Sequence, residues 1–394
     1  MFLTNVEEGY SMLIERLNNI EDIIALQEEY HKKNGIYPFN VSNWTVSDFF
    51  RKEMEQVFQH STTSSPIDYL YSYSITSEVK ENVMLKLGVN RELIYNKTCI
   101  FFPNNSQAIV NVCNLLQKVK CRKVGILNPA YFSIDACMSS YGISSVPFYT
   151  IRKEESYVIP LKEIVNENLD ALWITSPIYS TGTTYEDKNI EKIEKLLKTG
   201  ILIIVDESFC IKGHELVRRF ATYRNFICIY SPHKAISFNS YKFSAIICDN
   251  EYEDFFDQWL DVLCGNLPQT TIAAIHHYLS DNYDICYNAF ESFIRLAHDE
   301  VSLILEKFPN VKQDNIICGN LMTLYLNNLN FEQSKNLDFI NNTINNTCAV
   351  FYPGYLNGFS KDMGFCFRIN LALYSPDFIA SLNRLLLYLS SDNI

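Results

Sequence analysis

Between about residue 98 and residue 250, short apolar runs rich in β-branched residues alternate with segments of helical periodicity. Each run ends in polar, glycine or proline residues, and ten or more residues with helix-like spacing usually follow it. Strands that alternate with helices in this way predict an α/β fold, with a mostly parallel sheet covered by helices on both faces. The runs are TCIFF, KVGILN, SVPFY, DALWIT, ILIIVD, FICIYS and FSAIICD.

The pattern changes after about residue 265, where a long helical stretch leads into a mixed α+β segment that ends in FCFRINLALYSPDFIASLNRLLLYL. We therefore predict a large domain over residues 49–265 and a connecting helix with a smaller domain over residues 266–394. Residues 1–48 are expected to associate with the smaller domain. With 394 residues, of which 47% are hydrophobic, the chain can bury a core for both domains.

Composition argues against several classes of partner. The formal net charge is −12, and no run of Lys and Arg interleaved with aromatic residues is present, so nucleic acid is not an expected partner. Charged residues interrupt residues 1–30 and no apolar run is long enough to cross a bilayer, so we predict no membrane partner and a cytoplasmic location. The 12 cysteines are scattered without a C-x-x-C pair, which favours buried reduced thiols, and no metal site is predicted.

Polar residues follow several of the predicted strands. Asp206 closes ILIIVD, Lys234 comes just after FICIYS, Tyr131 follows KVGILNPA, and residues 104–106 follow CIFFP. Ligands of α/β sheets bind beyond the carboxyl ends of the strands, so these residues are expected to converge on one cleft.

Arg368 lies inside the apolar segment FCFRINL, where a guanidinium needs an anionic partner, either internal or from a ligand. A lysine after a strand is usually a surface residue, and Asp206 alone is compatible with a capping role. Together, Lys234, Asp206 and Arg368 describe a site for a cofactor with an aldehyde, a ring nitrogen kept protonated and a phosphate. Such a cofactor would act on a substrate that carries a carboxylate.

These residues resemble the motifs of the fold-type I pyridoxal-phosphate enzymes, specifically the class I/II aminotransferase family, over most of the chain. The family's lysine motif has a serine three residues before the Schiff-base lysine and a basic residue eight after it, which Ser231, Lys234 and Lys242 match. The sequence VDESF, some 28 residues upstream of the lysine, matches the strand-end aspartate that pairs with the pyridine nitrogen, giving Asp206.

The resemblance implies pyridoxal 5'-phosphate as the cofactor and assigns further contacts to it. FFPNNSQAI matches the phosphate-binding turn at a helix N-terminus, SPIYSTGTTY matches the P-x-N-P-T-G turn, and NPAY places an aromatic ring against the cofactor. YLYSYSITSEV resembles the segment that sends a tyrosine to the phosphate of the neighbouring subunit, for which we choose Tyr71 with Tyr73 as the alternative. The cofactor-binding residues so implied are Asn105, Ser106, Gln107, Tyr131, Tyr179, Asp206, Ser208, Phe209, Ser231, Lys234, Lys242 and Tyr71.

The resemblance also implies the substrate side of the site. VFYPGYLNG resembles the family's P-G turn, and FRINLAL resembles the segment whose arginine clamps the substrate α-carboxylate, which would be Arg368. Asn43 and Trp44 fall where the family's N-terminal segment lines the substrate pocket, although an aromatic residue there is equally compatible with packing. Because the family's active site is shared across a dimer interface, the resemblance implies a homodimer.

Three positions depart from the family pattern. Tyr179 stands where the family has an asparagine, and Phe209 stands where it has a tyrosine, so both usual donors to the cofactor's phenolic oxygen are replaced. Their loss should raise the pKa of the imine unless another donor compensates, and we hypothesise that the Tyr179 hydroxyl does so. Lys242 replaces the phosphate-binding arginine, which keeps the charge and loses the bidentate fork.

The favoured interpretation is an aminotransferase that acts on an α-amino acid and a 2-oxo acid through a Lys234 Schiff base, with Asp206 and Tyr179 as the other catalytic residues. In this interpretation Lys234 also moves the Cα proton. A lyase, cyclase, decarboxylase or oxidase of the same fold, in specialised biosynthesis, is the alternative. A non-catalytic cofactor-binding protein is disfavoured, because a scaffold needs none of Lys234, Asp206 and Arg368. The sequence does not determine the substrate side chain.

Overall fold

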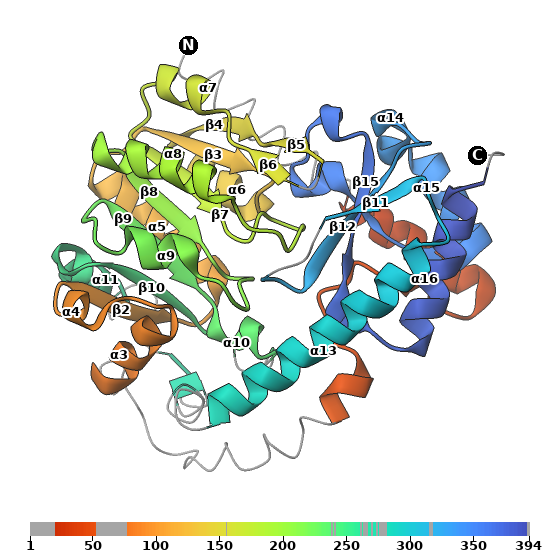
Figure 1. Ribbon diagram of the computed structural model, residues 1–394, viewed down its shortest axis with the longest axis horizontal. Coiled ribbons are helices and arrows are strands. Elements are labelled where there is room, and N and C mark those ends of the chain that lie inside the picture. The colour runs from red at the N-terminus through yellow and green to blue at the C-terminus, as the bar shows by residue number, and fades with distance from the viewer. Residues whose placement is uncertain are drawn as a thin grey trace.

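The computed structural model describes residues 20–52, 77–154, 156–237, 239, 242–260, 262, 267–268, 271–272, 275, 282–314 and 318–391. Tyr71 and Tyr73, the predicted phosphate ligands of a neighbouring subunit, lie outside these residues. Figure 1 shows the large sheet and its helices at the left and a smaller group of elements at the right. The long helix α13 (Asn282–Leu305) runs along the lower side of the molecule towards the smaller group. Among the described helices, none is both long enough and apolar enough to cross a membrane.

The large sheet contains seven strands within the described residues, in the order β2-β10-β9-β8-β7-β3-β4. Neighbouring strands are parallel except at β10, which is antiparallel to both β2 and β9. The prediction of a mostly parallel sheet is confirmed, and each of the apolar runs identified in the sequence forms one of its strands. The strands are β2 (Lys97–Phe102), β3 (Lys123–Asn128), β4 (Ser144–Tyr149), β7 (Ala171–Thr175), β8 (Leu202–Asp206), β9 (Phe226–Tyr230) and β10 (Ser244–Asp249).

Helices cover both faces of this sheet. Alternate residues of a strand point to opposite faces, and in β2 Ile100 and Phe102 belong to one buried apolar cluster whereas Cys99 and Phe101 belong to the other. The first cluster is completed by α5 (Asn105–Lys118), α6 (Phe132–Ser140) and α11 (Glu253–Trp259). The second is completed by α3 (Ser77–Lys86), α4 (Arg91–Ile94), α7 (Leu161–Asn166), α8 (Asp187–Lys198) and α9 (Glu215–Phe220).

Helix α8 illustrates how the sequence specifies such a layer. Ile190, Ile193 and Leu197 recur at helical spacing and are buried against the sheet. Asp187 lies in the first turn and Lys198 in the last, which favours the helix through its dipole. The apolar stripe therefore fixes which face of the helix is buried, and the charges stabilise its ends.

The smaller group contains an antiparallel sheet in the order β11-β12-β15-β14. Strand β1 lies before the predicted boundary at residue 48 and pairs in parallel with β13. The described part of the N-terminal segment therefore lies with the C-terminal elements. The domain boundaries themselves stay predictions. The strands are β1 (Phe39–Asn40), β11 (Val311–Gln313), β12 (Leu321–Leu326), β13 (Ala349–Val350), β14 (Tyr352–Pro353) and β15 (Phe365–Asn370). The helices are α14 (Phe331–Lys335), α15 (Leu337–Thr347) and α16 (Pro376–Leu389), with short 3-10 helices η4 (Gly354–Asn357), η5 (Lys361–Met363) and η6 (Leu371–Leu373). A further 3-10 helix, η2 (Asn250–Tyr252), directly follows β10 of the large sheet.

A small hairpin of β5 (Ile151–Lys153) and β6 (Ser156–Val158) connects the large sheet to the smaller group. Arg152 Nε donates to Asp314 Oδ1 at 2.8 Å, and the Arg152 guanidinium lies 4.1 Å from the ring centroid of Tyr325 in β12. The Tyr157 hydroxyl is hydrogen-bonded to the Asp314 carboxylate and to the Tyr325 hydroxyl. Because the Asp314 side chain is fully buried, this cluster holds the two parts together through a charged network.

Candidate active site

The candidate catalytic residues lie where neighbouring strands of the large sheet end. Asp206 is the last residue of β8, and Ser231 directly follows β9. Lys234 comes three residues later, in the short helix α10 (Pro232–Ala235). Since β8 and β9 are parallel neighbours, their carboxyl ends bring Asp206 and Lys234 to the same edge of the sheet, where the carboxylate charge acts on the lysine amine.

The Lys234 amine is in an environment that favours its neutral form. Its Nζ lies 3.8 Å from the ring centroid of Phe209. Burial lowers the pKa of Lys234 to about 8, the Asp206 charge opposes this shift, and the Lys242 charge adds to it. At pH 7 about a tenth of the amine is then unprotonated, compared with about one in three thousand for an ordinary lysine. Lys234 is therefore suited to attack a carbonyl group.

The Asp206 side chain is almost completely buried, at 3% exposure. Its Oδ1 accepts a hydrogen bond from the Ser208 backbone N–H at 2.9 Å, and Oδ2 receives none from the described residues. The Ser208 hydroxyl in turn donates to Asn105 Oδ1 at 2.6 Å, which ties the turn after β8 to the start of α5. Asp206 is thus held by its own turn through one oxygen, and its other oxygen has no donor among the described residues.

The N-terminus of α5 supplies backbone donors next to this carboxylate. Asn104 caps the helix, and its Oδ1 accepts from the Gln107 backbone N–H at 2.9 Å. The first backbone hydrogen bond of the helix runs from Ala108 to Asn104, so the N–H groups of Asn105 and Ser106 have no acceptor within the helix. Such amides, together with the helix dipole, favour a phosphate.

The two other residues of the predicted lysine motif, Ser231 and Lys242, lie on either side of Lys234 in the sequence. The Ser231 hydroxyl is fully buried and shares a 2.6 Å hydrogen bond with the Ser244 hydroxyl of β10. Lys242 is exposed just before β10, close enough to Lys234 for its charge to act there. The structure thus places one partnered hydroxyl and one exposed cation beside the lysine.

Aromatic side chains form the walls around the lysine. Tyr131 begins α6, and its ring centroid lies 6.0 Å from that of Tyr179. Phe209 lies 6.3 Å from Tyr179, and Trp44 lies 5.3 Å from Phe209. These four rings come from three strand ends of the large sheet and from the N-terminal segment, and Phe209 brings this aromatic cluster next to the amine.

Tyr179 links this space to Arg368. Arg368 Nη1 donates to the Tyr179 hydroxyl at 3.3 Å. Burial raises the pKa of the Tyr179 hydroxyl, and the Arg368 charge only partly offsets the shift, so the hydroxyl keeps its proton. Since its oxygen accepts from the arginine, its proton remains available to another acceptor, as the hypothesis for this residue requires.

Arg368 is a buried cation in the middle of β15, with 3% exposure. It donates to Asn357 Oδ1 at 2.9 Å and to the Ser42 backbone oxygen at 3.4 Å, and its Cζ lies 3.8 Å from the Trp44 ring centroid. Its buried Nε has no hydrogen-bond partner in the described chain. Burial lowers the pKa of Arg368, and no carboxylate of the described residues pairs with it. Within the described residues, this guanidinium therefore lacks the anion that a buried arginine requires.

The two N-terminal candidates, Asn43 and Trp44, are both exposed and differ in their contacts. The Trp44 ring lies against Arg368, whereas Asn43 Oδ1 accepts from the Trp44 backbone N–H at 2.7 Å. Sequence reasoning did not single out Ser42 and Asn357, which hold Arg368, or Tyr352, whose ring centroid lies 5.3 Å from the guanidinium. No sequence signal marks these contacts, because they join segments that are far apart in the chain.

His233, next to the lysine, faces away from the aromatic space. Its Nδ1 lies 2.6 Å from the Phe243 backbone oxygen. Burial, followed by the Lys234 charge, lowers the pKa of His233 to about 3, so the ring is neutral. The histidine therefore fixes the backbone around the lysine and is not positioned as a proton carrier in the cleft.

The fold was compared with known proteins. No protein-family model and no curated protein sequence matches the chain. Solved structures do match: the pyridoxal-phosphate-bound C-S lyase from Staphylococcus hominis has a TM-score of 0.70 at 16% identity, over 90% of this chain and 92% of that one. The methionine aminotransferase from Escherichia coli has a TM-score of 0.71 at 13% identity, over 93% and 95% of the two chains. Alanine aminotransferase from Pyrococcus furiosus has a TM-score of 0.71 at 16% identity, over 94% and 96%.

The chain has the fold of these enzymes. At such low identity the match establishes the shared architecture, and the chemistry has to be argued from the residues of this chain. Because the matches cover 90–94% of this chain, the similarity includes both the large sheet and the smaller group.

Proposed function

We propose that this protein is a pyridoxal-phosphate-dependent aminotransferase that acts on an α-amino acid. One observation carries the proposal: a lysine amine and a carboxylate meet at the carboxyl ends of two parallel strands, beside a buried arginine that has no acid partner in the described chain. The printed functions of the similar structures support it, since two of them are aminotransferases and one is a pyridoxal-phosphate-bound lyase.

The residues of the cleft fit this cofactor. The Lys234 amine would hold its aldehyde, Asp206 Oδ2 would pair with its ring nitrogen, and the amides of Asn105 and Ser106 would hold its phosphate. When bound, pyridoxal phosphate supplies a conjugated ring that accepts the electrons left after a bond to the substrate Cα breaks.

The chain's own residues supply binding and proton transfer. Arg368 would bind the substrate carboxylate and so determine which bond to Cα is oriented for cleavage. Lys234, with its lowered pKa, is suited to take the Cα proton as a base and to return it as an acid. Tyr179 would hold the Arg368 guanidinium through its oxygen and donate its proton towards the cofactor's phenolic oxygen. Trp44 would cover the guanidinium and exclude water from the carboxylate.

A lyase is the second candidate, with a cyclase, decarboxylase or oxidase as further variants. The replacement of both usual donors to the phenolic oxygen, by Tyr179 and Phe209, favours it, as does the C-S lyase among the similar structures. Both candidates need the same cofactor, lysine and arginine, and they differ in where the proton or the leaving group goes after the Cα bond breaks.

The oligomeric state and the location are part of the same proposal. A homodimer with a shared active site is proposed from the sequence resemblance, and Tyr71 is its expected contribution from the neighbouring subunit. A cytoplasmic location is proposed from the composition. Light scattering on the purified protein tests the dimer. The affinity for pyridoxal phosphate, measured with the wild-type protein and with Tyr71→Phe, tests the effect of that tyrosine on phosphate binding.

The experiment that tests the function is a half-reaction with a panel of amino acids. An aminotransferase converts the yellow form of the protein to the pyridoxamine form and releases a 2-oxo acid. Release of ammonia, carbon dioxide, a thiol or peroxide without a 2-oxo acid acceptor supports the second candidate instead. No spectral change with any amino acid, in protein that carries the cofactor, contradicts both.

A further inference from the structure

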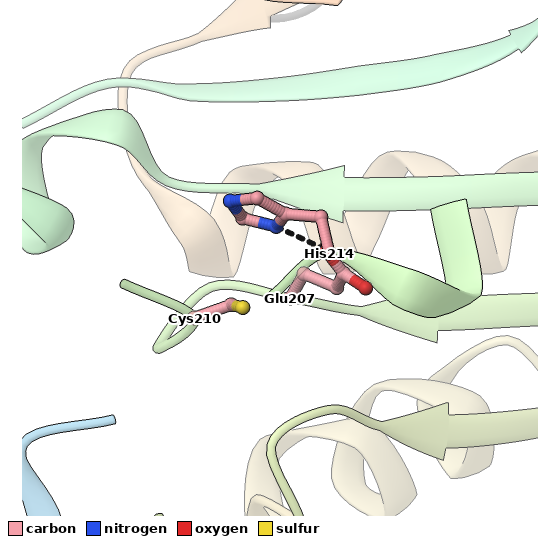
Figure 2. Close-up of side chains that lie close together, drawn as sticks. All are labelled: Glu207, Cys210 and His214. Carbon is pink, nitrogen blue, oxygen red and sulfur yellow. Dashed lines mark hydrogen bonds and ion pairs between the residues drawn. The ribbon is translucent and has the colours of Figure 1, made fainter. Parts of the chain in front are cut away.

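The loop that follows Asp206 brings three potential metal ligands together. The Cys210 backbone N–H donates to the Glu207 backbone carbonyl oxygen at 3.0 Å, which forms a turn in the chain. Gly213 then adopts a positive φ of 75°, a conformation that glycine allows readily, and His214 directly precedes α9. Figure 2 shows the result, in which the Cys210 sulfur points towards the Glu207 side chain and the His214 ring lies against the same carboxylate.

The three donor atoms lie within the reach of one metal ion. One atom each from Glu207, Cys210 and His214 can be chosen so that all lie within 4.8 Å of one another. The His214 Nδ1 and Glu207 Oε2 atoms are 2.5 Å apart. All three side chains are buried, with exposures of 0%, 1% and 6% in that order. Charged and polar side chains usually lie at the surface in contact with water, whereas these three are shielded from solvent.

The Glu207 carboxylate is incompletely satisfied by its protein neighbours. Its Oε2 pairs with His214, whereas its Oε1 is buried without a hydrogen-bond partner in the described chain. Neither a lysine nor an arginine of the described residues forms an ion pair with it. An unpaired acceptor of this kind costs about 1–3 kcal/mol, more when it is charged. A divalent cation would both coordinate Glu207 Oε1 and neutralise the charge of the carboxylate.

A second thiol lies beside the first. The Cys210 thiol donates to the Lys212 backbone oxygen at 3.1 Å, and the Cys318 thiol donates to the Gly182 backbone oxygen at 3.5 Å. The Ile211 backbone N–H donates to the Cys318 backbone oxygen at 2.6 Å, which brings the two cysteine-bearing segments together. Cys318 is also buried, and it lies three residues before β12 of the smaller sheet. The loop after β8 and the segment before β12 are therefore joined by a backbone hydrogen bond, and each carries a buried cysteine.

We propose that Glu207, Cys210 and His214 form a binding site for a zinc ion, and that Cys318, which lies outside this group in the structure, moves in as the fourth ligand when the ion binds. Thiolate, imidazole and carboxylate together are the donor set that Zn²⁺ prefers, and four protein ligands make a closed structural site. The short spacings of three and four residues between the first three ligands suit a single loop. Bonds of about 2.0–2.3 Å to the metal would replace the present Glu207–His214 hydrogen bond.

This site is structural and separate from the cleft. The ion would fix the loop that begins at Asp206 and carries Phe209, and it would join that loop to β12. Because the ligands must lose their protons to bind, zinc affinity is expected to rise with pH. The proposal does not depend on the reaction that the cleft carries out.

The test is metal binding by the full-length, tag-free protein. The protein is treated with a chelator, exposed to Zn²⁺ or Co²⁺, freed of excess metal and analysed for metal by mass spectrometry. We expect about one ion per chain, visible d–d absorption of Co²⁺ in a tetrahedral thiolate site, and X-ray absorption distances of about 2.3 Å to sulfur and about 2.0 Å to nitrogen or oxygen. No stoichiometric uptake in the wild-type protein overturns the proposal.

Variants assign the ligands. Cys210→Ser and His214→Gln should each lower the bound metal to below about a tenth of the wild-type level, and Cys318→Ser should weaken binding by about tenfold or more. Cys121→Ser is the matched control, because this half-exposed thiol lies just before β3, outside the cluster, and should leave uptake unchanged. Uptake that persists in Cys210→Ser or His214→Gln places the metal elsewhere and overturns the assignment. The X-ray absorption distances of the wild-type protein keep the test valid if a variant fails to fold.

Discussion

Replacing Arg368 by alanine should remove recognition of the substrate carboxylate. A charge-assisted hydrogen bond contributes about 1.5–3 kcal/mol, and a guanidinium makes two to a carboxylate, so the loss is about 3–6 kcal/mol. The arginine is 3% exposed, so screening by solvent does not reduce this figure appreciably. At 1.4 kcal/mol for each factor of ten, kcat/KM for an amino acid should fall by about 10²–10⁴.

The assay compares an amino acid with the amine that lacks its carboxylate. Single-turnover conversion of the cofactor spectrum is measured for both compounds with the wild-type protein and with Arg368→Ala. The wild-type protein should prefer the amino acid strongly. The variant should react with the amine at a rate within about threefold of the wild-type rate, because that compound never used the guanidinium.

Arg384→Ala is the control for the loss of an arginine as such. Arg384 is an exposed residue of α16, where its Nε donates to the Thr347 oxygen at 2.9 Å, and it should leave both rates unchanged. An amino-acid rate in Arg368→Ala within tenfold of wild type would refute the reasoning. Equal losses for the amino acid and the amine would also refute it, because they would indicate a general defect of the site.

Further predictions test the lysine, the tyrosine and the charged network between the two parts of the molecule. Because burial lowers the pKa of Lys234 to about 8, the rate at which cofactor-free protein takes up pyridoxal phosphate should rise with pH and level off above about pH 8, instead of rising to pH 10 as for an ordinary lysine. Tyr179→Phe should raise the pKa of the visible absorbance change by about 1–2 units, and identical titrations would remove the donor hypothesis. Asp314→Asn should lower the free energy of unfolding by about 3–5 kcal/mol, since it leaves the half-buried Arg152 without its partner, and an unchanged urea midpoint would contradict this.

Much of the large sheet could be predicted from its sequence because each strand is a short apolar run between polar breaks. Runs such as ILIIVD are buried on both faces, so they are continuous rather than alternating, and this is the mark of a covered parallel sheet. The reversed direction of β10 has no comparable signal, since antiparallel and parallel strands buried on both faces have the same composition. The β5–β6 hairpin was not predicted, because three-residue strands are too short to show a period.

The candidate site likewise contains residues that the sequence predicted and residues that it did not. Lys234 and Asp206 each end a recognisable strand, so their place at one edge of the sheet followed from the pattern. The neighbours of Arg368 did not, because Ser42 and Asn357 reach it from segments that have no local signature. Glu207, Cys210 and His214 were not predicted for a different reason: their spacing matches no familiar ligand motif, and the turns at Cys210 and Gly213 that bring them together have no distinctive sequence signal.

The central claim is that the amine of Lys234 holds pyridoxal phosphate. Borohydride treatment of the protein with bound cofactor, followed by proteolysis and mass spectrometry, measures this directly. We predict a reduced pyridoxyl group on the peptide that contains Lys234 and on no other lysine. A protein that carries no such group, or carries it at a different lysine, would contradict the account.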